Sequence, residues 1–155
     1  MLIRAAPRSD ASPLSQVLNR VVDEGDKTAI NSRLTGEEFT EWFLTGSHCV
    51  SCMLAQEDRG RILGFQVVER FHDDLPKGMA AIATFVSQDA RGQGGGTGLI
   101  DQTMRHARTY DVTSIRAVIR RTNRAAVRYY RSVGFLEDAG QAEALASVVL
   151  IRRLL

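Results

Sequence analysis

Glycines are concentrated in one stretch, Val86 to Gly98, which reads VSQDARGQGGGTG and holds five of the thirteen glycines of the chain. It follows the apolar run Met79 to Val86 and precedes a helical pattern from Leu99 to Tyr110. The backbone N–H groups of such a turn can surround an anion, and the start of the following helix adds about half a positive charge. We interpret the stretch as a phosphate-binding loop, with a plain turn that needs positive φ angles as the alternative.

The spacing of these glycines excludes two familiar phosphate-binding motifs. The loop of nucleotide triphosphatases places Lys and then Ser or Thr after its last glycine, whereas Gly96 is followed by Thr97 and Gly98. The dinucleotide fingerprint G-x-G-x-x-G fails at its third glycine. What remains is the order R-x-x-G-x-G, formed by Arg91, Gly94 and Gly96.

A second pattern lies in the segment NRAAVRYYRSVGF, residues 123–135. Asn123, Ala126, Tyr130 and Gly134 recur at helical spacing on one face of the predicted helix. Asn can cap a helix, Tyr can pack and Gly can end a helix, so a purely structural role is the alternative.

The two motifs together resemble those of the GNAT N-acetyltransferase superfamily, and the expected order of strands and helices agrees over nearly all of the chain. The resemblance implies that the first motif cradles the pyrophosphate of acetyl-CoA, while the strand before it bonds the pantetheine arm through its backbone. It also implies that Asn123 lies near the coenzyme and that Tyr130 is the catalytic residue beside the sulfur. The cofactor-binding residues implied are Phe85, Val86, Ser87, Arg91, Gly92, Gln93, Gly94, Gly95, Gly96, Thr97 and Asn123.

The chain also resembles the subgroup that includes phosphinothricin acetyltransferases, through its size and the stretch IATFVSQDARGQG. Many such enzymes place a Glu base in the middle of the strand before the glycine loop. Here that strand reads GMAAIATFV, has no carboxylate, and places Ala81 about where the Glu would be. The remaining candidates for the base are Glu24, Asp26, Glu69 and His72.

The implied reaction needs an oxyanion site and a proton for the departing thiolate. The backbone N–H of Val86 is expected to stabilise the oxyanion, and Tyr130 to protonate the sulfur. A phenol near pKa 10 is a weaker acid than a thiol near 8.5, so this transfer costs about 2 kcal/mol. Glu24 and Asp26 belong to an acidic turn that could hold the acceptor amine, with a polar helix end as the alternative.

Cys49 and Cys52 form C-x-x-C beside His48, which raises the question of a metal or redox site. The stretch is predicted to be a strand, in which residues three apart face opposite sides. A second Cys pair that would complete a zinc site is missing from the sequence. We therefore predict two buried thiols and no metal site.

Apolar periodicity and turn signals predict one α/β (α+β) domain over residues 1–155, with a mixed sheet of about six to seven strands and about four helices. The resemblance implies that this single domain is GNAT-like. The middle of the sheet is expected to hold three consecutive antiparallel strands, His48–Gln56, Arg61–Arg70 and Met79–Val86. Outer strands are expected over Leu2–Ala6, Ser114–Ile119, Phe135–Glu137 and Ala146–Leu154.

Helix boundaries are predicted from capping residues. Ser12 and Pro13 are expected to open a first helix that ends near Gly25. Thr35 and Glu38 form a capping box before a short helix with Phe39, Trp42 and Phe43 facing inward. The last helix is expected over Asn123–Val133, ended by Gly134.

Charge is unevenly distributed along a chain whose net charge is only +2. The segment from Arg91 to Arg131 holds nine arginines against Asp101 and Asp111, whereas residues 1–90 carry thirteen acidic and nine basic side chains. One half therefore suits a polyphosphate and the other a cation, with solvated helix faces as the alternative. The apolar N-terminal run is too short for a secretory signal and no run approaches a membrane span, so we expect a cytoplasmic protein.

The expected function is an acetyl-CoA-dependent N-acetyltransferase that acts on the primary amine of a small molecule, either amino acid-like or polyamine-like. An acyltransferase for protein N-termini or lysines is the nearest alternative. From other classes, a non-catalytic CoA-binding regulatory domain and a nucleic-acid binder remain open, and the latter would lose affinity steeply with salt. Neither nucleic acid nor membrane is an expected partner, and a homodimer is suggested by the resemblance alone.

Overall fold

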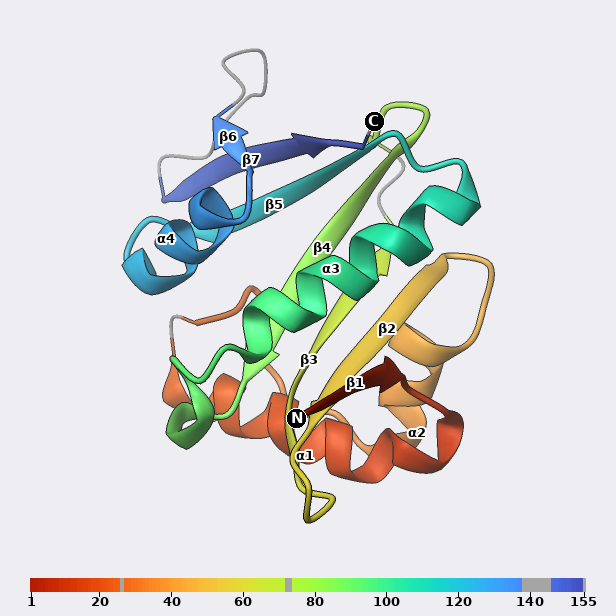
Figure 1. Cartoon of the computed structure of the whole chain (residues 1–155), viewed down its shortest axis with the longest axis vertical. Coiled ribbons are helices and arrows are strands. Elements are labelled where there is room, and N and C mark those ends of the chain that lie inside the picture. The colour runs from red at the N-terminus through yellow and green to blue at the C-terminus, as the bar shows by residue number, and fades with distance from the viewer. Residues whose placement is uncertain (26, 72–73, 138–145, 155) are drawn as a thin grey trace.

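The computed structural model describes residues 1–25, 27–71, 74–137 and 146–154. Within them, seven strands form one sheet in the order β1-β2-β3-β4-β5-β7-β6 (Figure 1). Neighbouring strands run antiparallel except β4 and β5, which are parallel. The expected mixed sheet is confirmed, with strands β1 (Leu2–Ala5), β2 (Cys49–Gln56), β3 (Ile62–Glu69), β4 (Met79–Val86), β5 (Ser114–Arg120), β6 (Leu136–Glu137) and β7 (Ser147–Arg153).

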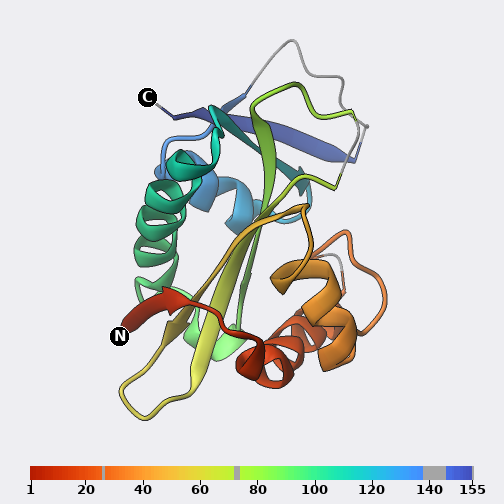
Figure 2. The same ribbon diagram turned by 90° about the vertical axis from the view of Figure 1, so that its right-hand side faces the viewer.

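Four α-helices in the described residues cover the two faces of the sheet, α1 (Ala11–Glu24), α2 (Gly36–Phe39), α3 (Gly95–Ala107) and α4 (Arg124–Ser132). Figure 2 shows α3 and α4 on one face and α1 and α2 on the other. Each face has its own apolar core. Phe39, Phe65 and Phe85 lie in the core under α1 and α2, while Ile100, Ile115 and Tyr130 lie in the core under α3 and α4. Because side chains alternate along β4, Thr84 belongs to the face opposite that of Phe85.

The sheet opens between β4 and β5. Their pairing comprises only Met79 with Ser114, Ala80 with Ile115 and Ala81 with Arg116, so β4 continues from Ile82 to Val86 beyond the paired region. The N–H of Ser87 donates to the carbonyl of Leu63 in β3 at 2.9 Å. Since backbone polar groups of successive residues point to opposite neighbours, those of Val86 face the opening.

The first helix begins two residues earlier than the capping signal predicted. Helix α1 starts at Ala11 with Asp10 at the N-cap, and a 3₁₀ turn over Arg8–Asp10 leads into it. Ser12 therefore lies inside the first turn, where its carbonyl accepts a hydrogen bond from the Ser15 hydroxyl. The predicted N-cap at Ser12 was wrong, because the 3₁₀ turn ends at Asp10 and the chain passes directly from this turn into the helix. The predicted end near Gly25 is confirmed by its φ of +72°.

The capping box of α2 is confirmed, whereas the inward position of Trp42 is wrong. Thr35 Oγ1 accepts from the N–H of Glu38, and the N–H of Thr35 donates to Glu38 Oε1. After four residues the helix widens into a π turn over Thr40–Leu44. In a wider turn each residue rotates by a smaller angle around the helix axis. Phe43 therefore lies on the same buried face as Phe39, whereas Trp42 lies outside that face. The Trp42 side chain is 46% exposed.

Helix α3 begins inside the glycine stretch, at Gly95, and not at Leu99 as its apolar pattern predicted. Gly94 holds the N-cap position with a φ of +86°, which a residue with a Cβ adopts only under strain. The helix ends at Ala107 and continues as a 3₁₀ turn over Arg108–Tyr110. Glycine's low helix propensity explains why the first turn read as a loop.

Helix α4 and the antiparallel pair of strands that ends the sheet agree with the prediction from the sequence. The Asn123 side chain accepts a hydrogen bond from the N–H of Ala126 at the start of α4, and Gly134 follows the helix with a φ of +97°. Strands β6 and β7 pair antiparallel. None of the helices in the described residues has the length and hydrophobicity of a membrane span.

Candidate active site

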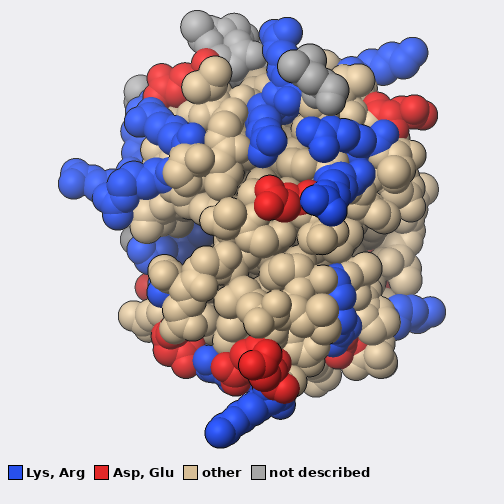
Figure 3. Space-filling view, in the orientation of Figure 1, with Lys and Arg blue, Asp and Glu red and all other residues tan. Residues whose placement is uncertain are grey.

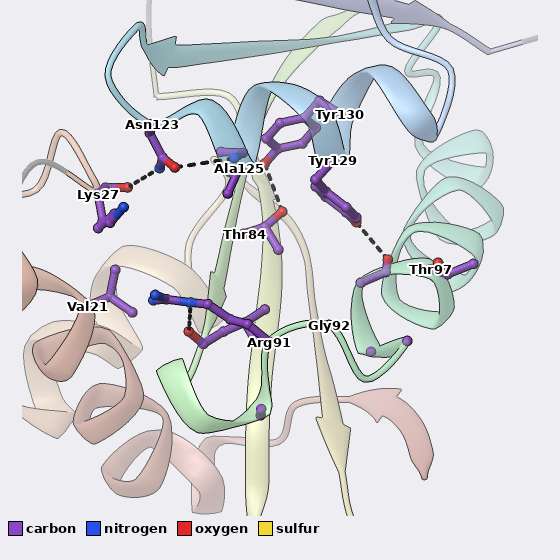
Figure 4. Close-up of a pocket in the computed structure, with 16 residues that line it drawn as sticks. Val21, Lys27, Thr84, Arg91, Gly92, Thr97, Asn123, Ala125, Tyr129 and Tyr130 are labelled. Carbon is purple, nitrogen blue, oxygen red and sulfur yellow. Dashed lines mark hydrogen bonds between the residues drawn. The ribbon is translucent and has the colours of Figure 1, made fainter.

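A pocket of about 380 Å³ lies where β4 and β5 diverge, between the start of α3 and the start of α4. Figure 4 shows side chains from the end of α1, from β4, from the glycine stretch and from α4 converging on it. Its lining comprises Val21, Lys27, Thr84, Val86, Ala90, Arg91, Gly92, Gly94, Gly95, Gly96, Thr97, Asn123, Ala125, Ala126, Tyr129 and Tyr130.

The structure brings most of the predicted site residues to this one pocket. Nine of them line it: Val86, Arg91, Gly92, Gly94, Gly95, Gly96, Thr97, Asn123 and Tyr130. Phe85, Ser87 and Gln93 are not among the lining residues. The Phe85 ring stacks on Phe65 in the opposite core at 4.9 Å, and Gln93 donates to the carbonyl of Asp89.

The start of α3 presents backbone donors to the pocket. The N–H of Gly98 donates to the carbonyl of Gly94 at 3.3 Å, as the first bond of the helix ladder. The N–H groups of residues 95–97 precede that bond and have no partner within the helix. Because the helix start also carries partial positive charge, this wall of the pocket is suited to an anion.

Arg91 is held by a carboxylate. Its two terminal nitrogens donate to the two Glu24 oxygens at 2.7 and 2.6 Å, and its Nε donates to the carbonyl of Val86 at 3.2 Å. The hydrogen bond from Arg91 lowers the pKa of Glu24, against an opposing effect of desolvation. The guanidinium thus joins the end of α1, the end of β4 and the glycine stretch, and its charge is compensated.

The candidate residues for substrate and base lie in different places. Glu24 lines a neighbouring hollow and not the pocket, and its role toward an amine stays a prediction. Asp26 and His72 lie outside the described residues. Glu69 on β3 is the register partner of Ala81 on β4, and the Glu69 carboxylate accepts a hydrogen bond from the N–H of Phe71.

Tyr130 is 4% exposed, and its hydroxyl lies 2.8 Å from the Thr84 hydroxyl (Figure 4). Burial raises the pKa of Tyr130 above its ordinary value of 10.0, while the hydrogen bond with Thr84 lowers it. The phenol is therefore protonated at neutral pH. It is also a weaker acid than the free phenol assumed from the sequence, so protonating a thiolate costs more than about 2 kcal/mol before any ligand changes its surroundings.

Sequence reasoning missed three polar residues beside Tyr130. Tyr129 donates its hydroxyl to the carbonyl of Gly96 at 2.7 Å. Gln66 Nε2 donates to Thr84 Oγ1 at 2.9 Å and to the Tyr129 hydroxyl at 3.1 Å. The paired tyrosines of the motif could have drawn attention to Tyr129, whereas Gln66 and Thr84 sit in apolar strands without any signal.

The C-x-x-C stretch forms no metal-ligand cluster in the described part of the chain. Cys52 is buried, as predicted, but Cys49 is only half-buried, because a register shift next to Cys49 interrupts the regular strand. The Cys49 thiol donates to the carbonyl of Thr45 at 2.9 Å.

The uneven charge of the sequence is visible on the surface. On the face drawn in Figure 3, Lys and Arg side chains are most numerous over the half of the molecule that carries α4, β5 and β7. This half borders the pocket, which suits a ligand that carries several negative charges.

An opened mixed sheet with a helix start suited to an anion at the opening agrees with the class expected from the two sequence motifs, an acyltransferase. The model of the Acetyltransferase (GNAT) family matches residues 19–135. The chain therefore belongs to the GNAT family and is an acetyltransferase.

Three proteins that are similar to this chain share about a fifth of its residues. YwnH of Bacillus subtilis (strain 168), provisionally named a phosphinothricin acetyltransferase, is 22% identical over 138 residues, which are 88% of this chain and 85% of that protein. A GCN5-related N-acetyltransferase from Kribbella flavida is 23% identical with a TM-score of 0.83, covering 99% of this chain and 97% of that one. A phosphinothricin acetyltransferase from Sinorhizobium meliloti, solved with AcCoA, is 19% identical with a TM-score of 0.83, covering 99% and 88%.

Proposed function

We propose that this acetyltransferase transfers the acetyl group of acetyl-CoA to the primary amine of a small molecule. The observation that carries the proposal is one pocket lined both by the backbone at the start of α3 and by the buried phenol of Tyr130. Acetyl-CoA carries its diphosphate and its thioester at opposite ends of the pantetheine arm, so its ends match the two chemistries. The solved relative from Sinorhizobium meliloti holds AcCoA, which supports this assignment.

The diphosphate would lie on the N–H groups of residues 95–97, with Gly92 and Gly94 giving the backbone its positive φ angles. The pantetheine arm would run between β4 and β5, beside the backbone groups of Val86 that face the opening. Arg91, already paired with Glu24, would shape the loop and leave the anion to the backbone. Asn123 would frame the pocket through its hydrogen bonds at the start of α4.

The acceptor amine would attack the thioester carbonyl, and the N–H of Val86 would stabilise the resulting oxyanion. When the C–S bond breaks, its electron pair goes to sulfur and Tyr130 supplies the proton. An amine with a pKa of about 10.4 needs roughly 4 to 5 kcal/mol to lose its own proton at neutral pH. On the described part of the sheet, Glu69 is the candidate acceptor of that proton because it stands beside Ala81 across β3 and β4.

A screen of amines tests the proposal, with release of free thiol from acetyl-CoA as the readout. It should contain amino acids, phosphinothricin-like compounds, polyamines and, as a separate arm, peptides with free N-termini and lysines. We expect thiol release with at least one small amine and none with the peptides. Turnover confined to the peptide arm, or acetyl-CoA binding without turnover on any amine, would overturn the small-molecule assignment. Sedimentation of the purified protein would test the homodimer, which stays a prediction.

A further inference from the structure

A chain of partly buried hydrogen bonds runs along the wall of the pocket and joins the glycine stretch to Tyr130. It passes from the carbonyl of Gly96 to the Tyr129 hydroxyl at 2.7 Å, on to Gln66 Nε2 at 3.1 Å, then to Thr84 Oγ1 at 2.9 Å and to the Tyr130 hydroxyl at 2.8 Å. The participating side chains come from β3, β4 and α4. Figure 4 shows both ends of this chain, at Tyr129 and at the pair formed by Thr84 and Tyr130.

The direction of these hydrogen bonds follows from the number of protons on each group. The carbonyl of Gly96 can only accept a hydrogen bond, so the Tyr129 hydroxyl donates its single proton to that carbonyl. The Tyr129 oxygen must then accept from Gln66, which places the amide nitrogen of Gln66 and not its oxygen on this side. The second N–H of the same nitrogen is directed at Thr84 Oγ1, which therefore accepts.

Thr84 is left with one proton of its own, and the hydroxyl oxygen of Tyr130 is the partner that the structure offers it. We propose that Gln66 and Thr84 are positioning residues that turn the phenol proton of Tyr130 into the pocket, because Thr84 donates to the Tyr130 oxygen instead of accepting from it. The inference rests on the proposed function, in which that proton goes to the coenzyme sulfur.

The environment of Gln66 supports a functional role. It is fully buried in a strand whose neighbouring side chains are apolar, and its Oε1 has no hydrogen-bond partner among the described residues. A buried acceptor without a partner destabilises the fold, so an apolar residue would suit this position better if packing alone decided. What Gln66 supplies is a pair of N–H donors in fixed directions.

In the reaction, the phenol O–H of Tyr130 breaks and its proton bonds to the sulfur as the C–S electron pair moves there. The tyrosinate that remains accepts the hydrogen bond from Thr84, whose own oxygen accepts from Gln66. Donation to the charged form favours it, so the chain makes Tyr130 a better acid than burial alone allows. The tyrosinate regains a proton from solvent, to which Glu69 in turn releases the proton taken from the acceptor amine.

Single-turnover rates of acetyl transfer test the positioning role. Thr84→Val should slow transfer about tenfold, the order expected for one hydrogen bond, with the affinity for acetyl-CoA unchanged, and Thr84→Ser should restore most of the rate. In the Tyr130→Phe background, Thr84→Val should have no further effect, because there is no phenol proton to orient. Gln66→Leu should slow transfer in the same direction without loss of stability. Thr103→Val is the control, since Thr103 is a buried threonine that does not line the pocket, whereas Thr84 is half-buried and lines it. If Thr84→Val slows transfer by the same factor in the Tyr130→Phe background as in the unmodified protein, the proposal is overturned.

A measurement independent of turnover decides the direction of the bond itself. Labelling with 3,5-difluorotyrosine acidifies the phenols, and fluorine NMR then follows the titration of Tyr130, assigned by its loss in Tyr130→Phe. If Thr84 donates, Thr84→Val raises the pKa of Tyr130, since the tyrosinate loses a donor. If Tyr130 donates, the same substitution lowers that pKa and the proposal fails. This titration gives its answer even if no acceptor amine is found, so failure of the proposed function is recognised separately.

Discussion

Glu24 and Arg91 form a two-pronged ion pair, with N···O distances of 2.7 and 2.6 Å, between the end of α1 and the glycine stretch. The pair connects residues 67 positions apart. Because of this pair, Arg91 has a structural role at the wall of the pocket. The Glu24 carboxylate, which the sequence suggested as a ligand for the amine, is already bound to Arg91.

Replacing Glu24 by Gln should lower the free energy of unfolding by up to about 1 kcal/mol at neutral pH, the order for a partly exposed pair. The pKa of Glu24 is lowered in the folded protein from an ordinary value of 4.5. Its contribution is therefore present above that value and is lost as pH falls through the lowered one. Urea unfolding of both proteins at neutral pH and well below pH 4.5 should show a difference that disappears in acid.

The exposed Glu41 gives a matched control, because Glu41→Gln should change stability little at either pH. The KM for the amine separates the two roles of Glu24. If that KM rises strongly in Glu24→Gln while stability stays constant, Glu24 binds the amine and the structural account of the pair is wrong.

Gly96 and Gly95 should respond differently to alanine. A Cβ on Gly96 would lie 2.6 Å from Cε1 of Tyr129, so the ring must move and its bond to the Gly96 carbonyl is lost. We expect Gly96→Ala to destabilise the fold by about 1 to 3 kcal/mol and to weaken acetyl-CoA binding. A Cβ on Gly95 meets Met1 Sδ at an ordinary 3.6 Å, so Gly95→Ala should be neutral or stabilising. Equal unfolding midpoints for the two variants in urea would contradict this reading.

Tyr130→Phe should lower kcat by about 10²-fold or more, because general-acid catalysis contributes on that scale. The dissociation constant of acetyl-CoA should change little, since the ring and its packing against Phe135 remain. Stopped-flow single turnover with calorimetry of acetyl-CoA binding measures both. Tyr110→Phe serves as the control, as Tyr110 is exposed and does not line the pocket. An unchanged rate of the chemical step would remove Tyr130 from the proposed role.

Both cysteine thiols should react slowly in the folded protein. Burial raises the pKa of Cys49 and, more strongly, that of Cys52 from an ordinary value of 9.0, and the thiolate is the reactive form. Ellman's reagent at mildly alkaline pH should therefore modify the denatured chain much faster than the native one. A native thiol that reacts as fast as free glutathione would show that the stretch is open to solvent.

Local chemistry in the sequence predicted the elements well where a single residue decides a boundary. Thr35 and Asn123 cap their helices through their own side chains, and Gly25 and Gly134 end helices with positive φ angles. Such signals act within one turn and depend little on distant contacts. The signal at Ser12 failed because the turn over Arg8–Asp10 starts the helix earlier. Trp42 was misplaced because the widening of the turn after Phe39 has no marker in the residues themselves.

The site was predictable only as far as its motifs extend. The first turn of α3 consists of weak helix formers, and the Tyr129 hydroxyl donates to the Gly96 carbonyl within it, a contact between residues 33 apart. Gln66 meets Tyr129 across 63 positions, through the register of β3 and the placement of α4. Contacts of this kind depend on the tertiary packing of the whole domain, so no residue spacing in the sequence predicts them.

The central claim is that the backbone at the start of α3 holds the diphosphate of acetyl-CoA, and amide NMR tests it most directly. Nitrogen-labelled protein is titrated with acetyl-CoA and, separately, with S-acetylpantetheine, which has the thioester but no diphosphate. The account predicts that the amide resonances of residues 92–97 move with acetyl-CoA and stay in place with S-acetylpantetheine. Resonances that stay in place with acetyl-CoA, or that move equally with both ligands, would contradict it.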